Sequence, residues 1–198
     1  MTRPRTTNRL ARSLGAATLI TAALSASACN GSPDATQTPS TTVPSSTPTP
    51  TPSTPAPPVL PAKAKGLTVE SADAFTRFYL ELLDYAKATG GTSAVRAWSD
   101  KGCIGCGQAI RDYDKVHKAG GAYSGDYTYT GYHASVVRLN KTKTGAEVKF
   151  TAQVGRHSVT ETRGGAPRSY PGGPVRYRMT LVGRNGQWIA YELEDVNG

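Results

Sequence analysis

The stretch AEVKFTAQV at residues 146–154 alternates apolar and polar side chains at every position. An alternation with a period of two predicts a β-strand that buries one face and exposes the other. Residues 127–139, 175–181 and 189–194 continue the pattern, with Ile189, Tyr191 and Leu193 expected on the apolar face of the last strand. The second half of the chain therefore predicts a run of half-buried strands.

Turn signals between these stretches predict how the strands connect. Asn185-Gly186 favours a tight two-residue hairpin, because both residue types tolerate a positive φ. Residues 140–145 predict a looser hairpin, and the Gly/Pro-rich residues 163–174 predict a long loop. Because hairpins join antiparallel neighbours, we expect an antiparallel sheet.

The first half of the domain has helical spacing instead. Residues 68–88 place their apolar side chains on one stripe, and Thr68 or Ser71 can cap this helix. A second, short helix is expected after a Thr92 cap, and a third over residues 107–119, ended by Gly120-Gly121. Helices followed by strands predict an α+β fold, with three N-terminal helices packed on one face of a curved antiparallel sheet.

Three segments carry a resemblance to known families: AFTRFY at 74–79, ATGGT at 88–92, and SD at 99–100 leading to CIGC at 103–106. In these segments the chain resembles a family of uncharacterised actinobacterial lipoproteins, domain of unknown function 6318. The order of elements resembles the nuclear-transport-factor-2-like fold, a cone of helices against a bent sheet. The resemblance implies this fold and an extracytoplasmic compartment, and it implies no activity.

The N-terminus has the order of a secretory signal. Four arginines in the first twelve residues precede a short apolar run at 14–24 and the small residues before Cys29. This order predicts a signal peptide over residues 1–28, and its apolar run is too short to span a bilayer. Ala26-Ser27-Ala28-Cys29 is similar to a lipobox, which predicts lipidation of Cys29. The alternative is ordinary secretion after an A-x-A cleavage site.

The number of cysteines supports lipidation. The chain has three, and an unpaired thiol is unusual in an oxidising compartment. A lipid on Cys29 leaves Cys103 and Cys106 as a pair, which we expect to form a structural disulfide. The alternatives for this C-x-x-C pair are thiol–disulfide exchange and a metal site, although two thiolates would need further ligands.

The composition divides the rest of the chain in two. Residues 29–65 are dominated by Ser, Thr, Pro and Ala, which predicts a disordered tether extended by its Thr-Pro repeats. O-glycosylation of the tether and an unmodified spacer both stay open.

Residues 66–198 predict one globular α+β domain. Its 17 Lys and Arg against 13 Asp and Glu, a net charge of +4, fit ordinary solubility or an anionic envelope surface.

Tyrosine is abundant in the strand-rich half, which favours either core packing or a pocket for a small molecule or glycan. The candidate ligand-binding residues are Tyr127, Tyr129, His133 and Arg178. No nucleophile motif appears, and we assign no catalytic residue. Asp84, Asp126 and His133 are the nearest acid–base candidates, and His117 and His157 are further possible bases. We expect no cofactor and no metal.

These features predict a lipoprotein anchored to the outer face of the cell membrane, whose domain binds a ligand or a protein without catalysis. The expected partners are the membrane, through lipidated Cys29, and a cell-wall polymer or an envelope protein. Because the domain would be exported from the cytoplasm, we expect it to have no nucleic-acid partner. One alternative is a small envelope enzyme, either a thiol–disulfide oxidoreductase through Cys103 and Cys106 or a cavity hydrolase or isomerase. Another is a homodimerising structural module.

Overall fold

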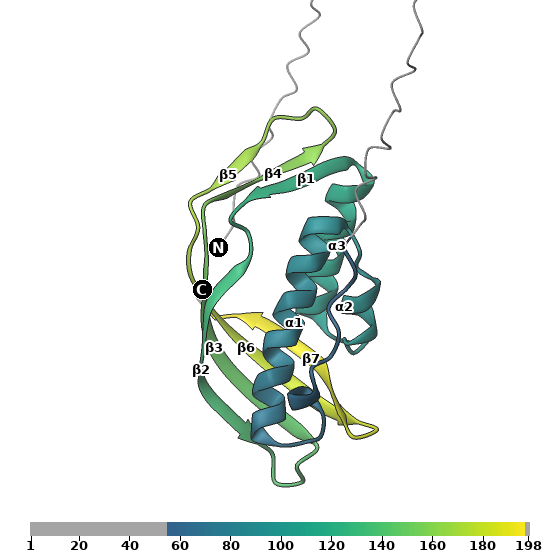
Figure 1. Cartoon of the computed structure of the whole chain (residues 1–198), viewed down its shortest axis with the longest axis vertical. Coiled ribbons are helices and arrows are strands. Elements are labelled where there is room, and N and C mark those ends of the chain that lie inside the picture. The colour runs from purple at the N-terminus through teal and green to yellow at the C-terminus, as the bar shows by residue number, and fades with distance from the viewer. Residues whose placement is uncertain (1–54, 197–198) are drawn as a thin grey trace, which may run out of the picture. The chain divides into compact units, whose positions relative to one another are not determined.

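The computed structural model describes residues 55–196. The predicted signal peptide, Cys29 and most of the predicted tether lie outside these residues. The helices are a 3-10 helix η1 at Ala62–Ala64, α1 at Val69–Thr89, α2 at Ser93–Ala97 and α3 at Ile104–Lys118 (Figure 1). The strands are β1 (Gly120–Gly125), β2 (Tyr129–Leu139), β3 (Gly145–Val154), β4 (His157–Thr162), β5 (Arg168–Tyr170), β6 (Gly173–Arg184) and β7 (Gln187–Asp195). Within the described residues, none of the helices has the length and apolarity needed to cross a membrane.

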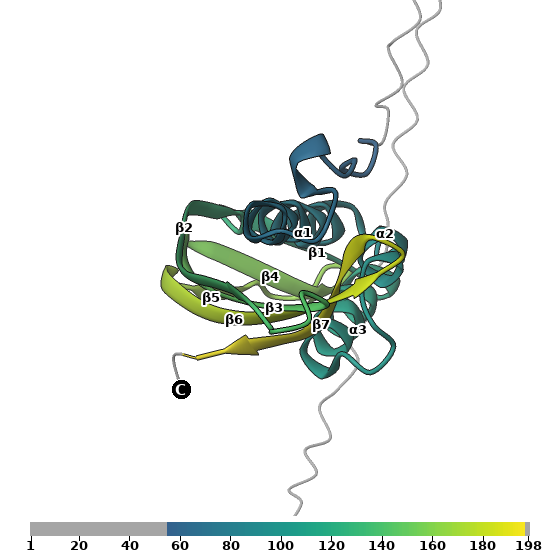
Figure 2. The same cartoon turned by 90° about the horizontal axis from the view of Figure 1, so that it is seen from below.

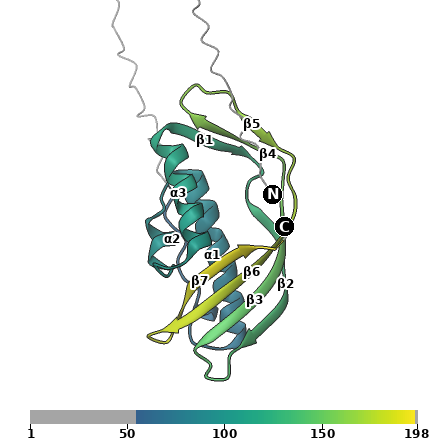
Figure 3. The same cartoon turned by 180° about the vertical axis from the view of Figure 1, so that it is seen from behind.

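The strands form two antiparallel sheets. One has four strands in the order β2-β3-β6-β7, and the other has three in the order β1-β4-β5. The central pair β3 and β6 is in register from Gly145↔Val182 to Val154↔Gly173, so the hairpins β2–β3 and β6–β7 lie side by side. Figures 1 and 3 show the smaller sheet continuing beyond one end of the larger one, since β3 leads into β4 and β5 into β6.

Helix α1 packs on the concave face of the four-stranded sheet, as the end-on view in Figure 2 shows. Its N-terminus has a capping box, in which the Ser71 amide donates to Thr68 Oγ1 (3.1 Å) and the Thr68 amide to Ser71 Oγ (2.9 Å). The predicted stripe is buried as expected, at Ala72, Phe75, Tyr79, Leu82, Leu83 and Ala86. The sheet contributes Val148, Phe150, Met179, Leu181 and Trp188 to the same core. The predicted α+β fold, three helices on a curved antiparallel sheet, is confirmed.

Two short strands lie where the sequence predicts a helix stop and a loop. Gly120-Gly121 does end α3, but the same glycines begin β1, which pairs with β4. A methyl group on Gly121 would lie 2.0 Å from the Thr160 carbonyl oxygen, so glycine permits the close approach of β4. The predicted loop over 163–174 contains β5 and the start of β6.

Strand β7 changes its buried face halfway along. Trp188 and Ala190 are fully buried, whereas Tyr191 is exposed and Leu193 packs against the core. A register shift in the pairing with β6 leaves Tyr191 out of the ladder, as in a β-bulge. The predicted apolar face of Ile189, Tyr191 and Leu193 is therefore wrong for its first two members, because the bulge reverses the alternation.

Three local predictions also need correction. The packed domain begins before residue 66, because η1 precedes it and Ala64 is fully buried in the core. Thr92 does not cap α2 with its side chain. Its hydroxyl instead donates to Asp114 Oδ1 at 2.8 Å, which ties α2 to α3. The helix start predicted at residue 107 lies at Ile104, with Cys103 as the N-cap.

Candidate functional site

A cavity of about 360 Å³ lies where α1 and six of the seven strands meet. Apolar parts of its wall come from Val154, Val175 and the 171–174 segment that leads into β6. The rest of the wall is aromatic or polar, with Lys87 from α1 and rings from the two sheets and from the segment between β1 and β2. These side chains are Tyr123, Tyr127, Tyr129, His157, Tyr170 and Tyr177. The cavity thus combines a large aromatic surface with a few polar groups, as small-molecule sites commonly do.

Among the residues that the structure describes, Lys87 is the one cation on this wall, and it is almost fully buried. Its Nζ donates to Asp84 Oδ1 at 3.2 Å and to the Tyr127 carbonyl oxygen at 3.0 Å. The same nitrogen lies 3.9 Å from the centroid of the Tyr129 ring, within range of a cation–π interaction. The Tyr129 amide completes the cluster by donating to Asp84 Oδ2 at 3.0 Å. The ion pair therefore fixes the end of α1 to the start of β2.

Burial acts on both partners of this pair. It raises the pKa of Asp84 above its ordinary value, while Lys87 and the Tyr129 amide oppose the shift. It lowers the pKa of Lys87, while the Asp84 carboxylate opposes that shift. Each group stabilises the charged form of the other, so the pair presents the cavity with no net charge.

The tyrosine rings contact one another edge-on. The centroids of Tyr123 and Tyr127 are 6.1 Å apart, and those of Tyr129 and Tyr177 are 6.2 Å apart. Burial raises the pKa of Tyr123 to about 12 and that of Tyr129 well above its ordinary value. These phenols stay protonated at neutral pH, and a phenol hydroxyl both donates and accepts hydrogen bonds.

A stacked pair of rings closes another part of the wall. His157 and Tyr170 are opposite each other on β4 and β5, and their rings stack at 5.1 Å with an interplanar angle of 9°. His157 Nδ1 lies 3.0 Å from the Gly155 carbonyl oxygen, a hydrogen bond that requires the proton on Nδ1.

The structure brings together only part of the predicted ligand site. Tyr127 and Tyr129 line the cavity. His133 is exposed and pairs with Thr151 on the outer face of the sheet, away from α1. Arg178 lies on that same face, where its Nε donates to Glu194 at 2.7 Å. Because successive side chains of a strand alternate between the two faces of the sheet, His133 and Arg178 lie on the face opposite the cavity.

The acid–base candidates are also dispersed. Asp84 contacts the cavity residue Lys87, but Asp126 is exposed and lies outside the wall. His117 Nε2 is 2.8 Å from the Lys87 carbonyl oxygen and so joins α3 to the end of α1. Lys87 itself was not predicted, although it follows Leu83 by four residues and so continues the apolar stripe. A lysine on the apolar stripe of a helix indicates a buried charge, and this is the sequence signal that was overlooked.

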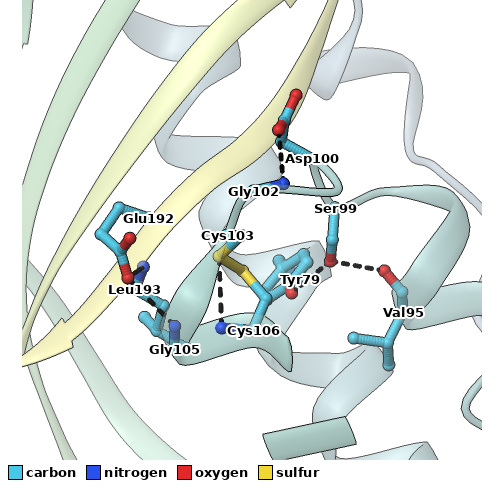
Figure 4. Close-up of a disulfide and its surroundings, with 10 residues drawn as sticks. All are labelled: Tyr79, Val95, Ser99, Asp100, Gly102, Cys103, Gly105, Cys106, Glu192 and Leu193. Carbon is cyan, nitrogen blue, oxygen red and sulfur yellow. Dashed lines mark hydrogen bonds between the residues drawn. A yellow bond between two sulfur atoms is a disulfide. The ribbon is translucent and has the colours of Figure 1, made fainter. Parts of the chain in front are cut away.

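Cys103 and Cys106 form a disulfide at the start of α3 (Figure 4). The exposed fractions are 4% for Cys103 and 0% for Cys106, and the Cys106 amide donates to Cys103 Sγ at 3.2 Å. Exchange requires that an attacking thiolate reach a sulfur atom. Burial of both sulfurs favours the structural role that the sequence predicts. Among the described residues, no cluster of three or more His, Cys, Asp or Glu could hold a metal ion.

Helices on one face of a curved antiparallel sheet, with a cavity where these layers meet, define an α+β domain. The model of a family of unknown function, DUF6318, matches residues 42–194, and the chain belongs to this family. A search of curated protein sequences found no relative.

Solved structures with a similar fold include the intermembrane space region of the chloroplast protein ARC6. The TM-score is 0.52 and the identity 13%, over 65% of this chain and 95% of that one. Rd1NTF2_05, in a multiply substituted form, gives a TM-score of 0.37 at 9% identity, over 64% and 96% of the two chains. Aln2 from a Streptomyces species gives 0.39 at 12% identity, over 63% and 89%. The ARC6 similarity shows a shared fold.

Proposed function

We propose that the chain is a cell-envelope lipoprotein whose domain binds a small ligand in the aromatic cavity without catalysing a reaction. The observation that carries this proposal is the cavity itself. Its volume of about 360 Å³ is in the range of small-molecule sites, and its wall is mainly aromatic with few polar groups. The wall is built by six strands and α1, so the fold holds it in place.

The hydrogen bonds of the Asp84–Lys87 pair favour a supporting role for these two residues over catalysis. A nucleophilic lysine needs an unprotonated amine, and a general base needs a free lone pair. Lys87 instead donates to Asp84 and to the Tyr127 carbonyl and faces the Tyr129 ring. The carboxylate of Asp84 accepts through both of its oxygens. These groups support the wall of the cavity.

The envelope part of the proposal comes from the N-terminal sequence. A basic segment, a short apolar run and Cys29 stand in the order of a lipoprotein signal, and a Ser/Thr/Pro-rich tether follows. A buried disulfide in the domain is consistent with folding in an oxidising compartment. The tether would let the domain sample ligands at a distance from the membrane.

Filling the cavity tests the binding role. Val175 lies on the wall, and Val175→Trp is expected to occupy much of the space. The probe is N-phenyl-1-naphthylamine, an uncharged aromatic dye, whose fluorescence should rise with the native full chain and not with this variant. Val59→Trp is the matched control, because Val59 is 86% exposed and outside the cavity. Equal dye binding by the two variants, both folded by circular dichroism, would contradict a role for the cavity.

A separate experiment tests the anchor. Cys29→Ala removes the thiol that would carry the lipid, so the chain should move from the membrane fraction to the soluble fraction. Cys29→Ala protein that remains in the detergent-extracted membrane fraction would disprove anchoring through this residue.

A further inference from the structure

A second cavity of about 270 Å³ adjoins the first. One side is formed by Asp112, Lys115 and Val116 of α3, and another by Val159 and Glu161 of β4. The rest of its wall is formed by Tyr123, His157 and Tyr170, which also line the first cavity. The same three rings are therefore a wall common to both spaces.

The register of the smaller sheet explains this common wall. Tyr123 of β1 is opposite Val159 of β4, and His157 of β4 is opposite Tyr170 of β5. His157 and Val159 are two residues apart on one strand, so all four side chains lie on the same face. This face is the one turned toward α3, which contributes the other side of the second cavity. The rings stand in a row along one continuous surface.

The two cavities differ in chemistry. Tyr, His, Val, Pro and Gly line the first together with the neutralised Lys87, and its wall contains no Leu, Ile, Met or Phe among the described residues. The second has two carboxylates, Asp112 and Glu161, against the single ammonium of Lys115. Lys115 and Glu161 are 3.3 Å apart and largely exposed, so they stand at its mouth. One end of the surface offers aromatic faces and hydroxyls, and the other offers hydrogen-bond acceptors.

We propose that the two cavities are adjoining subsites for one short, uncharged oligosaccharide. This inference rests on the ligand-binding role proposed above and adds the class and the length of the ligand. A sugar ring has apolar faces that pack on aromatic rings, and hydroxyls around its rim that donate to carboxylates. Tyr123, His157 and Tyr170 would contact both sugars, while Asp112 and Glu161 would accept hydrogen bonds from the second.

The other common ligand classes fit this surface less well. An acyl chain would be expected to meet long aliphatic side chains, whereas the aliphatic side chains of the first cavity among the described residues are the short ones of Val154, Val175, Pro171 and Pro174. An anion would meet two carboxylates in the second cavity and a lysine already neutralised by Asp84 in the first. An uncharged oligosaccharide fits both the aromatic wall of the first cavity and the hydrogen-bond acceptors of the second cavity.

Titration calorimetry on the full chain tests the proposal with two probe series, oligomers of N-acetylglucosamine and of glucose, each from one to four sugars. In at least one series the affinity should rise about tenfold from one sugar to two or three and then level off, since a hydrogen bond to a charged group is worth about that factor. Asp112→Ala with Glu161→Ala removes both carboxylate acceptors and should remove most of the gain with length. Tyr170→Ala should weaken binding of every oligomer, whereas Tyr170→Phe keeps the ring and should retain most of it. Glu81→Gln, exposed on α1 and outside both cavities, should match the unaltered chain.

The N-phenyl-1-naphthylamine experiment separates the two proposals. If neither sugar series binds with a length dependence but the dye still occupies the first cavity, the oligosaccharide assignment is overturned and the ligand-binding role survives. If neither the sugars nor the dye bind, both are overturned. A gain with length that is undiminished in the Asp112/Glu161 double variant would also overturn the two-subsite arrangement.

Discussion

Gly105 lies against the backbone of Leu193 so closely that a methyl group in its place would stand 1.9 Å from the Leu193 carbonyl oxygen. The Gly105 amide donates to Glu192 Oε1 at 3.1 Å, so the first turn of α3 is fastened directly onto β7 (Figure 4). The glycine inside the C-x-x-C motif is therefore explained by packing. The disulfide and the contact between Gly105 and β7 both stabilise the first turn of α3.

We predict that Gly105→Ala destabilises the protein by about 1–3 kcal/mol, the usual cost of overpacking, and by more if α3 has to leave β7. The measurement is urea denaturation of the full chain. Gly107→Ala, two residues along the same helix, is the control. Its new methyl would meet only the flexible end of Arg111, and alanine is the better helix former by about 1 kcal/mol. Equal stability changes for both variants would contradict the close contact at Gly105.

The helical half of the fold was predictable because its signals are local. The stripe on α1 and the Thr68 cap follow from the helical period and from the side chain at the N-cap. Asn185-Gly186 also forms the expected tight turn, with φ values of 51° and 76°. In each case the residues that decide the structure are within a few positions of one another.

The parts that escaped prediction depend on distant partners. Gly121 is required by β4, some forty residues later, and its sequence neighbours show only a helix stop. The bulge at Tyr191 arises from pairing with β6. The cavity collects side chains from α1 and six strands, so no short motif marks it. Residue type alone suggested Tyr127 and Tyr129, which line the cavity, and also His133 and Arg178, which lie outside it.

The disulfide should act as a structural brace. Replacing both Cys103 and Cys106 by alanine is expected to lower the free energy of unfolding by about 2 kcal/mol, the chain-entropy value for so short a loop. In the native protein, dithiothreitol should reduce the bond only slowly, because both sulfurs are buried. Alkylation followed by mass spectrometry measures this rate.

The same reduction in concentrated urea is the control and should be fast. Rapid reduction of the native protein, at a rate near that in urea, would contradict a structural bond and favour the thiol–disulfide oxidoreductase. Retention of stability in the double alanine variant would point the same way.

The buried tyrosines predict alkaline unfolding. Burial raises the pKa of Tyr79 and of Tyr123 to about 12, so the folded chain holds these protons where the unfolded chain has lost them. Stability should therefore fall as the pH rises from the ordinary tyrosine value of 10.0 toward about 12. Tyrosinate absorbance and circular dichroism should change together in this range. Ionisation of the tyrosines with a midpoint near pH 10 and the fold intact would show that these rings are accessible to solvent.

Breaking the Asp84–Lys87 pair is expected to be the most costly single change at a polar residue. Asp84→Asn removes the charge that offsets the burial of Lys87, and loss of one partner of a buried pair costs about 3–5 kcal/mol. Glu161→Gln is the control, since its partner Lys115 is exposed and such a pair contributes at most about 1 kcal/mol. Urea denaturation at neutral pH compares the two variants.

The pH dependence of Asp84→Asn identifies the cause of its instability. Without the carboxylate, the pKa of Lys87 in the folded state falls further below its ordinary value of 10.5. Between these two pKa values the unfolded chain binds the extra proton, so stability should rise with pH from neutrality toward 10.5. Lys87→Met combined with Asp84→Asn removes the titrating amine and should abolish this rise. A loss of stability in Asp84→Asn that is independent of pH over that range would mean that the buried ammonium is not its source.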